Sequence, residues 1–279
     1  MKMVNEIIQS DEKVLARRLL RFARNDNVAN FSTNCIVLFL VISLFSCVPY
    51  QVREKKIQEA NLHYDIGINY LRQNKFQEAK TEFDYALKKN NKKPEIYYAA
   101  GLANSKLSDY DGAIRDFKKA LKLNPDFSEA RNGLASTFAF QKKFNDAIKE
   151  WKKVLKDSIY QYQETIHFNM ANAYFEIGDF ESARENYNAV LRVYPDNLMS
   201  RFYLGKVYEK SGKYDLACEE YKKSTEIDKA FIPAHFSLGE NYFRLGREKE
   251  AIKEFEMVIV LEPDSNLGKE AKRYLEKLK

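Results

Sequence analysis

The feature that most constrains this chain is a set of residue types that recurs about every 34 residues. An alanine recurs at Ala79, Ala113, Ala147, Ala183, Ala217 and Ala251, at intervals of 34, 34, 36, 34 and 34 residues. Four residues after each alanine stands an aromatic residue: Phe83, Phe117, Trp151, Tyr187, Tyr221 and Phe255. A fixed period of about 20–50 residues is the sequence signature of stacked supersecondary units.

One unit, Pro94 to Phe127, shows what each recurring residue does. Counted from Pro94 as position 1, small residues at positions 8, 20 and 27 let antiparallel helices approach closely, and the aromatic residue at position 24 fills the space between repeats. Pro125 at position 32 ends the second helix. This pattern resembles the tetratricopeptide repeat over residues 60–265. The resemblance implies an all-α fold, an α-solenoid of six helix-turn-helix repeats.

After the last repeat, residues 266–279 carry one further apolar stripe. Pro263 and Ser265 precede it and are typical helix stop and N-cap residues. We expect this segment to form a C-terminal capping helix that covers the exposed side of the sixth repeat.

The N-terminal region differs from the repeats. Residues 1–34 are polar, and Ile36 to Phe45 form a ten-residue apolar stretch. That length fits the hydrophobic region of a signal peptide better than a membrane-spanning helix of about 20 residues. The segment Leu44-Phe45-Ser46-Cys47 resembles a bacterial lipobox. The resemblance implies that Cys47 is lipidated and begins the mature protein, and that Val48 after it directs sorting to the outer membrane.

The expected organisation is therefore an extension (1–34), a signal region with lipobox (35–47), a tether (48–59), the repeats (60–265) and the capping helix (266–279). The nearest basic residue on the upstream side of the apolar stretch, Arg24, lies far from it. We therefore expect translation to start later than Met1, with residues 1 to about 27 absent from the native protein. The alternative is an uncleaved anchor from Phe31 to Tyr50, which implies attachment to the inner membrane.

Composition excludes several classes of function. The formal net charge is +6, but residues 47–279 hold 40 Lys and Arg against 36 Asp and Glu, so no nucleic-acid-binding surface is expected. The three cysteines, Cys35, Cys47 and Cys218, form no disulfide framework.

No catalytic, metal-binding or cofactor-binding motif is present, so we expect a protein that is not an enzyme. His63, His167 and His235 all occupy position 4 of separate repeats. Stacked repeats hold equivalent positions apart, so these histidines are expected to be structural rather than ligands of one metal.

Function is then expected on the concave face, which in tetratricopeptide proteins is lined by positions 2, 5, 9, 12 and 13 of the first helices. These positions are rich in apolar residues and are rimmed by basic ones such as Lys106 and Arg244. The predicted partner-binding residues are Tyr64, Ile68, Leu71, Tyr98, Leu102, Phe140, Phe168, Phe175, Phe202, Phe236 and Phe243. We expect them to bind an apolar or amphipathic segment of another protein. The alternative is that neighbouring helices shield these rings.

A narrower resemblance rests on the lipobox, the six repeats and the two-residue offset after the third repeat. The junction reads VLKDSIYQYQETIHFNMANAYFEIGDFESA. It is similar to the corresponding link in the pilotins of the type IV pilus, the PilF/PilW/Tgl family. The resemblance implies an outer-membrane lipoprotein that faces the periplasm, binds secretin subunits and assists their assembly. The alternative is a general cell-envelope scaffold that serves outer-membrane assembly or polysaccharide export.

Overall fold

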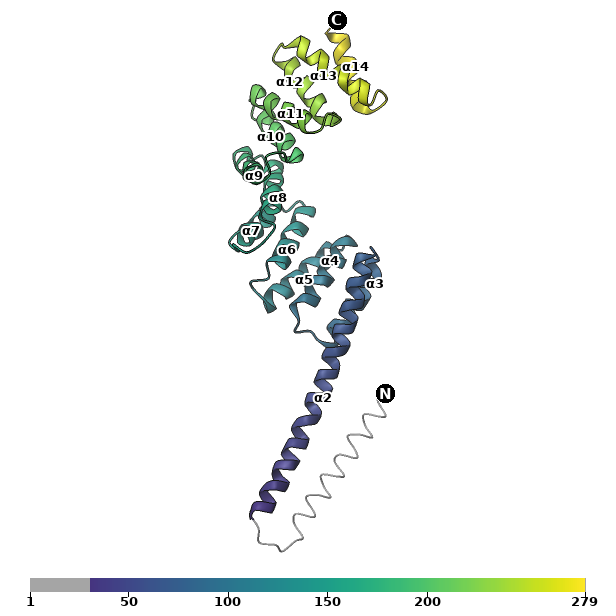
Figure 1. Cartoon of the computed structure of the whole chain (residues 1–279), viewed down its shortest axis with the longest axis vertical. Coiled ribbons are helices and arrows are strands. Elements are labelled where there is room, and N and C mark those ends of the chain that lie inside the picture. The colour runs from purple at the N-terminus through teal and green to yellow at the C-terminus, as the bar shows by residue number, and fades with distance from the viewer. Residues whose placement is uncertain (1–30, 279) are drawn as a thin grey trace.

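The structure is a computed structural model that describes the backbone of residues 31–278 and the side chains of residues 50–278. The predicted extension lies almost wholly outside the described residues, and so does the side chain of the predicted lipidation site, Cys47. All regular structure in the described part is helical (Figure 1), which confirms the predicted all-α class.

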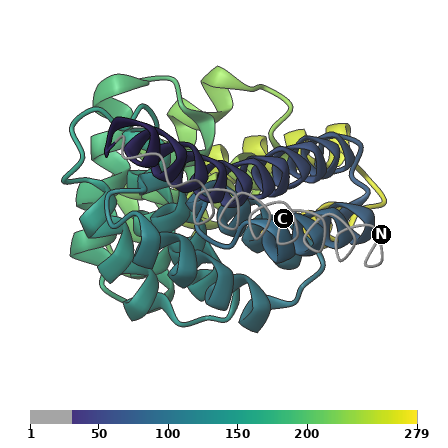
Figure 2. The ribbon, with the colours of Figure 1, turned by 90° about the horizontal axis from the view of Figure 1, so that it is seen from below.

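Thirteen helices are described, and they pair into six repeats followed by a single helix. Their bounds are α2 (Phe31–Arg72), α3 (Phe76–Lys89), α4 (Pro94–Lys106), α5 (Tyr110–Leu123), α6 (Ser128–Phe140), α7 (Phe144–Val154), α8 (Gln163–Glu176), α9 (Phe180–Val193), α10 (Leu198–Lys210), α11 (Tyr214–Ile227), α12 (Ile232–Arg244), α13 (Glu248–Leu261) and α14 (Asn266–Lys277). The main contacts of each helix are with the next helix or the one after it, as in a solenoid. The predicted tetratricopeptide solenoid is therefore the observed fold, and Figure 2 shows the succession of helices from below.

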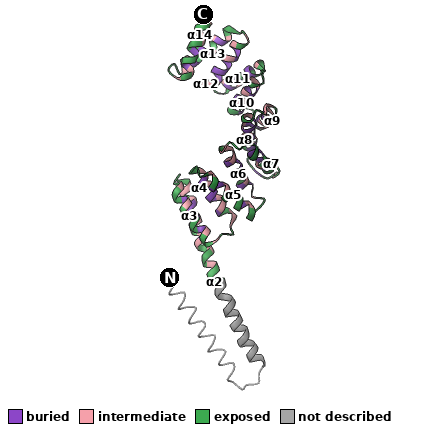
Figure 3. Ribbon diagram, turned by 180° about the vertical axis from the view of Figure 1, so that it is seen from behind, coloured by how far each residue is buried: buried purple, intermediate pink, exposed green. Residues whose placement is uncertain are grey.

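The recurring residues form the interior of each repeat. The six alanines at position 20 are all fully buried, and the aromatic rings at position 24 are at most 2% exposed. In four repeats the ring packs directly on a glycine at position 8. A Cβ atom added to Gly67 would lie 2.5 Å from the ring of Phe83, and one added to Gly205 would lie 2.6 Å from the ring of Tyr221. The buried residues lie between the helices, as Figure 3 shows.

The turn inside each repeat has one residue, at position 15, in the left-handed region. Its φ is 80° at Gly178 and 71° at both Gly212 and Gly246. The first three repeats place other residues there: Asn74 (φ 58°), Ser108 (62°) and Lys142 (58°). This conformation is sterically free only for glycine. The stacked helices therefore impose it on the first three repeats.

The two ends of the solenoid differ. At the C-terminal end, Ser265 accepts a hydrogen bond from the backbone N–H of Gly268 and starts α14. Tyr274 of this helix stacks on Phe255, with ring centroids 4.7 Å apart, so α14 covers the last repeat. At the other end, Leu62 of α2 is 59% exposed, whereas its equivalents in the next two repeats, Ile96 and Ala130, are fully buried.

Helix α2 is 42 residues long and continues upstream of the first repeat without a break. Residues 48–59, which the sequence analysis assigned to a tether, are helical and continuous with the first repeat. Residues 51–59 contain Glu, Lys, Gln and Arg, which favour helix, whereas Pro49 within α2 lacks the backbone N–H that a helix interior uses. None of the helices in the described part of the chain combines the length and the apolar character that a membrane crossing requires.

Candidate protein-binding face

The predicted partner-binding residues lie on the first helices of the repeats, α2, α4, α6, α8, α10 and α12. Several neighbouring first helices contact one another directly, namely α2 with α4, α4 with α6 and α6 with α8. No comparable approach is found between successive second helices in the described part of the chain. The first helices therefore lie on the inner side of the curved solenoid.

Most predicted residues on this face are only partly accessible. Phe140 is 65% exposed, whereas Phe202 and Phe236 are buried, with 6% and 7% of their surface exposed. The other members of the set are half-buried: Tyr64, Ile68, Leu71, Tyr98, Leu102, Phe168, Phe175 and Phe243. The expectation that these side chains are accessible to a partner is therefore wrong for Phe202 and Phe236. Whether the remaining residues bind a partner stays a prediction.

The reason for this burial is a pair of rings inside each repeat. The position 5 ring packs against the position 24 ring of the same repeat, for example Phe202 on Tyr221 with centroids 5.6 Å apart. The equivalent pairs are Tyr64 with Phe83 (6.1 Å), Tyr98 with Phe117 (6.1 Å), Phe168 with Tyr187 (5.9 Å) and Phe236 with Phe255 (5.8 Å). Such pairs are stabilised beyond the burial of apolar area. Position 5 thus contributes to the core as well as to the face.

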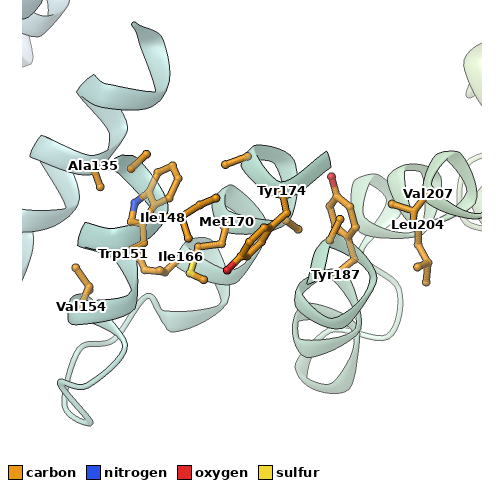
Figure 4. Packing of buried hydrophobic residues seen from close by; sticks show 14 of the residues in the cluster. Ala135, Ile148, Trp151, Val154, Ile166, Met170, Tyr174, Tyr187, Leu204 and Val207 are labelled. Atoms are coloured by element: carbon orange, nitrogen blue, oxygen red, sulfur yellow. The ribbon is translucent and has the colours of Figure 1, made fainter. Parts of the chain in front are cut away.

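The third repeat replaces this ring pair with hydrogen bonds. Its position 5 residue is Asn132, whose carbonyl oxygen accepts a 2.9 Å hydrogen bond from Nε1 of Trp151. The Asn132 amide donates to the hydroxyl of Tyr160 at 3.1 Å. Figure 4 shows Trp151 packed with Ile148 and Ile166 in the cluster that joins repeats three and four.

The junction after the third repeat exposes apolar side chains next to this buried group. Ile159 is 86% exposed and Tyr162 is 57% exposed, whereas Tyr160 between them is 9% exposed. Tyr160 and Tyr162 are in edge contact, with centroids 5.9 Å apart. Sequence reasoning detected the two extra residues here but assigned them no binding role. The break in the 34-residue period, together with its apolar residues, was the available signal.

A ladder of polar pairs links positions 4 and 23 in five repeats. Arg131 donates to Glu150 at 2.9 Å, and Arg201 donates to Glu220 at 2.8 Å. We call each pair between positions 4 and 23 a rung. The three histidines form the rungs of repeats one, four and six: His63 with Glu82 (2.6 Å), His167 with Asn186 (2.8 Å) and His235 with Glu254 (2.6 Å). Each histidine pairs within its own repeat. No group of three or more metal-ligating side chains lies together within the described residues.

The second repeat has no cation at this rung. Its position 4 residue is Tyr97, and Asp116 at position 23 accepts a 2.7 Å hydrogen bond from the amide of Asn104 instead. Burial raises the pKa of Asp116 to about 6. Burial likewise raises the pKa of Tyr98 to about 12 and of the Cys218 thiol to about 11. These two groups are therefore protonated at neutral pH.

Basic residues cover part of the inner face. Lys206 lies over the ring of Phe202 at 5.2 Å, and Arg244 lies over Tyr214 at 5.7 Å. Acidic residues face the same helices: Glu209 accepts from the hydroxyl of Tyr221 at 2.8 Å, and Glu240 accepts from Tyr274 at 2.8 Å. The face therefore offers both charge signs beside accessible apolar carbon, an arrangement suited to an amphipathic peptide.

Comparisons with known proteins agree with this architecture. Family models described as tetratricopeptide repeat match residues 64–107 and 168–230, residues 94–127, and residues 234–265. The chain is 35% identical over 92 residues to the RNA polymerase-associated protein CTR9 of Saccharomyces cerevisiae, a match that covers 33% of this chain and 8% of CTR9. The chain thus spans a small part of the length of that relative.

Three solved structures are similar over most of their own length. The structure of MamA is 30% identical and has a TM-score of 0.57; the match covers 61% of this chain and 91% of MamA. PilW, described as a widely conserved type IV pilus biogenesis factor, is 18% identical with a TM-score of 0.66, covering 76% of this chain and 98% of PilW. PilF of Pseudomonas aeruginosa is 15% identical with a TM-score of 0.64, covering 78% of this chain and 99% of PilF. For PilW and PilF, identity at this level shows a shared fold alone.

Proposed function

This chain belongs to the tetratricopeptide repeat family, whose fold is a protein-interaction scaffold, and we propose that it is a non-enzymatic adaptor of the cell envelope that acts in type IV pilus biogenesis. It is attached to the outer membrane through lipid on Cys47 and faces the periplasm. Its inner face binds an apolar or amphipathic segment of a secretin subunit and shields that segment until the subunits assemble.

The observation that carries this proposal is the fold match over nearly the whole of PilW, a type IV pilus biogenesis factor. The lipobox-like segment that ends at Cys47 and the apolar stretch before it support attachment to a membrane. Alternating rings and charges on the first helices support capture of a peptide that has both apolar and charged side chains.

We use the accessible apolar residues to propose where the partner contacts this face. Phe140 is open and stacks on Tyr110 at 5.9 Å, so its ring is held in place before binding. Ile159 and Tyr162 form a second exposed apolar region at the junction after the third repeat, toward the opposite end of α6, where Tyr160 accepts a hydrogen bond from Asn132. We place the centre of the interface at repeats three and four, because rigid, exposed aromatic residues are typical binding hot spots.

The second candidate function is a general envelope scaffold that joins other proteins, in outer-membrane assembly or polysaccharide export. It is favoured by the match to MamA, which is more similar in sequence to this chain, at 30% identity, than PilW is, and whose description names no pilus role. The two candidates share a binding face and differ in the partner that it selects.

Deletion of the gene separates them. If the chain assists a secretin, the deletion strain loses secretin multimers from its outer-membrane fraction, and the wild-type gene restores them. Secretin multimers present at the normal level and location in the deletion strain would contradict the pilus proposal. The general envelope scaffold would then be the remaining candidate function. Palmitate labelling that is lost in Cys47→Ser tests the attachment separately.

The binding face is tested with the purified full chain and the secretin subunit of the same organism. Phe140→Ala is expected to weaken binding about tenfold, the effect of a moderate hot spot. Its unfolding midpoint stays near that of the wild type, because the ring is already 65% exposed. Lys118→Ala, an exposed change on the second helix α5, is the matched control and leaves affinity unchanged. Equal affinity of Phe140→Ala and the control would place the interface elsewhere.

A further inference from the structure

A hollow of about 900 Å³ lies at the start of the solenoid, beside the N-terminal end of the candidate protein-binding face, where Lys93 lies over the ring of Tyr64 at 5.0 Å. One wall is the stretch of α2 just before the first repeat, and the other is the segment that joins α3 to α4. Its lining residues are Val52, Arg53, Lys56, Ile57, Lys89, Asn90, Asn91, Lys92, Lys93, Pro94 and Glu95. The two walls are separated by more than thirty residues in sequence. The packing of α2 against the following helices therefore brings them together.

The charge of this hollow is strongly unbalanced. Five of its lining side chains are basic, and one, Glu95, is acidic. Of the basic residues, Lys89 is neutralised by Glu59, whose carboxylate lies 2.5 Å away. The ammonium group of Lys93 binds the neutral amide oxygen of Asn61 at 3.0 Å. The remaining three, Arg53, Lys56 and Lys92, have no side-chain partner among the described residues.

A second hollow on the same molecule provides the contrast. It is about 400 Å³ and is lined by Asp196, Arg201, Lys223, Glu226 and Ile227. Both of its cations are engaged by one carboxylate, since Arg201 and Lys223 bind Glu220 at 2.8 and 2.6 Å. Charges there are balanced within the chain. In the first hollow, by contrast, three cations have no carboxylate partner within the described part of the chain. Compact basic clusters of this kind bind phosphate groups.

The position of the hollow on α2 identifies the source of the phosphate. Arg53 follows Cys47, the proposed lipid-bearing residue, by six residues on the same helix, a rise of about 9 Å at about 1.5 Å per residue. The headgroup layer of a bilayer extends roughly 5–8 Å beyond the hydrocarbon on each side. With the acyl chains of Cys47 in the lipid layer, the basic hollow therefore lies at the outer edge of the headgroups.

The residues between Cys47 and the hollow fit the same arrangement. Tyr50 is 63% exposed and Val52 is 51% exposed, so neither side chain is covered by the solenoid. Tyrosine is enriched at the depth of the headgroups, where one end of its ring is apolar and the other is polar.

We propose that this basic hollow binds the phosphate group of an anionic phospholipid and so fixes the first repeat against the membrane surface. The inference rests on the proposed membrane attachment through the N-terminal region. Each Lys or Arg near an anionic surface strengthens binding about fivefold. The three unpaired cations therefore give a clear preference for anionic over zwitterionic lipid.

Lysine footprinting of the full chain in nanodiscs tests this inference. The chain is reconstituted in discs of phosphatidylcholine alone and in discs with 30% phosphatidylglycerol (about one lipid in three), and lysine acetylation is followed by mass spectrometry. We expect acetylation of Lys56 and Lys92 to slow at least about threefold in the anionic discs. Acetylation of Lys118 and Lys119, exposed on the outer helix α5, is the internal control and does not change.

Two further arms make the result specific. Lys92→Gln, at an exposed residue without a side-chain partner, is expected to remove most of the slowing at Lys56, whereas Lys119→Gln retains it. Millimolar inorganic phosphate added to the phosphatidylcholine discs is expected to leave Lys56 and Lys92 unprotected. Equal protection by free phosphate would show a soluble anion site and overturn the lipid assignment.

Failure of the two proposals can be told apart. A chain that does not co-purify with discs of either lipid would contradict the membrane attachment, and this inference with it. A chain that enters both discs but shows equal acetylation rates in them would overturn this inference alone.

Discussion

The first three repeats and the last three reach the same backbone with different residues. Position 15 is left-handed in all six, but it is glycine only in repeats four to six. In the first half, Lys142 at this position has φ 58°, a conformation that costs a residue with a Cβ roughly 1–2 kcal/mol. The comparison teaches that contacts between stacked helices, rather than the local preference of the turn residue, determine this turn.

The first half also contains two further departures, in the ring pairs and in the polar rungs. The ring pair between positions 5 and 24 is replaced in repeat three by Asn132, which joins Trp151 and Tyr160. The polar rung between positions 4 and 23 is incomplete in repeat two, where Asp116 has an amide partner instead of a cation. The second half keeps both the ring pairs and the rungs.

The largest expected effect tests whether the rings contribute equally in both halves. Phe117→Ala in the first half and Phe255→Ala in the second should each lower the free energy of unfolding by about 3–5 kcal/mol, because both rings are at most 1% exposed and their removal leaves a cavity. Chemical unfolding gives the total, and hydrogen exchange shows which repeats open. A loss below about 1 kcal/mol for Phe117→Ala alone would mean that the halves differ in their cores.

The next effect concerns the exception in repeat three. Trp151→Phe removes the indole N–H and leaves the Asn132 carbonyl without its donor, so we expect a loss of about 1–3 kcal/mol. Adding Asn132→Leu should recover part of this loss, because the unsatisfied group is then removed as well. Strictly additive losses in the double variant would show that the two residues are not coupled.

A smaller effect depends on pH and on the incomplete rung. Burial raises the pKa of Asp116 to about 6, whereas an unfolded aspartate titrates near about 4. The folded chain therefore binds more protons between these values, and the stability that Asp116 contributes is full below about pH 4 and is lost as pH rises through about 6. Asp116→Asn should remove this loss, so that the wild type falls by about 1–2 kcal/mol relative to the variant between pH 4 and 7.

Urea unfolding at several pH values measures this difference. Asp126→Asn, at an exposed residue in the same repeat, is the matched control and should follow the wild type. A constant difference between wild type and Asp116→Asn across the range would contradict the assignment.

The smallest effect returns to the turn. Lys142→Gly should stabilise the chain by about 1 kcal/mol or less, because the relief of strain is partly offset by the greater entropy of unfolded glycine. Gly212→Lys, the reciprocal change in the second half, should destabilise it by a similar amount. Thermal unfolding of both variants is the measurement. A destabilising Lys142→Gly would show that the lysine side chain makes a contribution larger than the strain.

The fold was predictable because the residues that pack inside a helical repeat recur at the same position of every repeat. The unit at Pro94 to Phe127 and the observed intervals of 34 and 36 residues place the starts of later repeats at Ser128, Leu198 and Ile232, and α6, α10 and α12 begin at these residues. Small residues at fixed positions could be interpreted one repeat at a time, without knowledge of how the repeats curve. The turn at position 15 was also implicit in Gly178, Gly212 and Gly246.

The candidate site was harder to predict from the sequence. The exposure of a side chain on the binding face depends on which residue occupies a second position that packs against it. Position 5 was interpreted as surplus to the core, yet Phe202 and Phe236 pack on the position 24 rings and are buried. The internal repeats held a clue: where position 5 is not aromatic, at Asn132, position 24 is the tryptophan that can donate a hydrogen bond to it. Comparing positions in pairs across the repeats would have revealed both the ring pairs and the polar rungs.

The unbroken course of α2 has a consequence for orientation. Since an α-helix has about 3.6 residues per turn, each residue inserted or deleted between Gln51 and Ala60 would rotate all six repeats by about 100° around the helix axis. A deletion of about seven residues, close to two turns, would restore the azimuth while drawing the repeats about 10 Å nearer to the N-terminal end. The length of α2 thus sets both the rotation of the solenoid about the helix axis and its distance from the N-terminal end of α2. The number of residues removed can change either quantity separately.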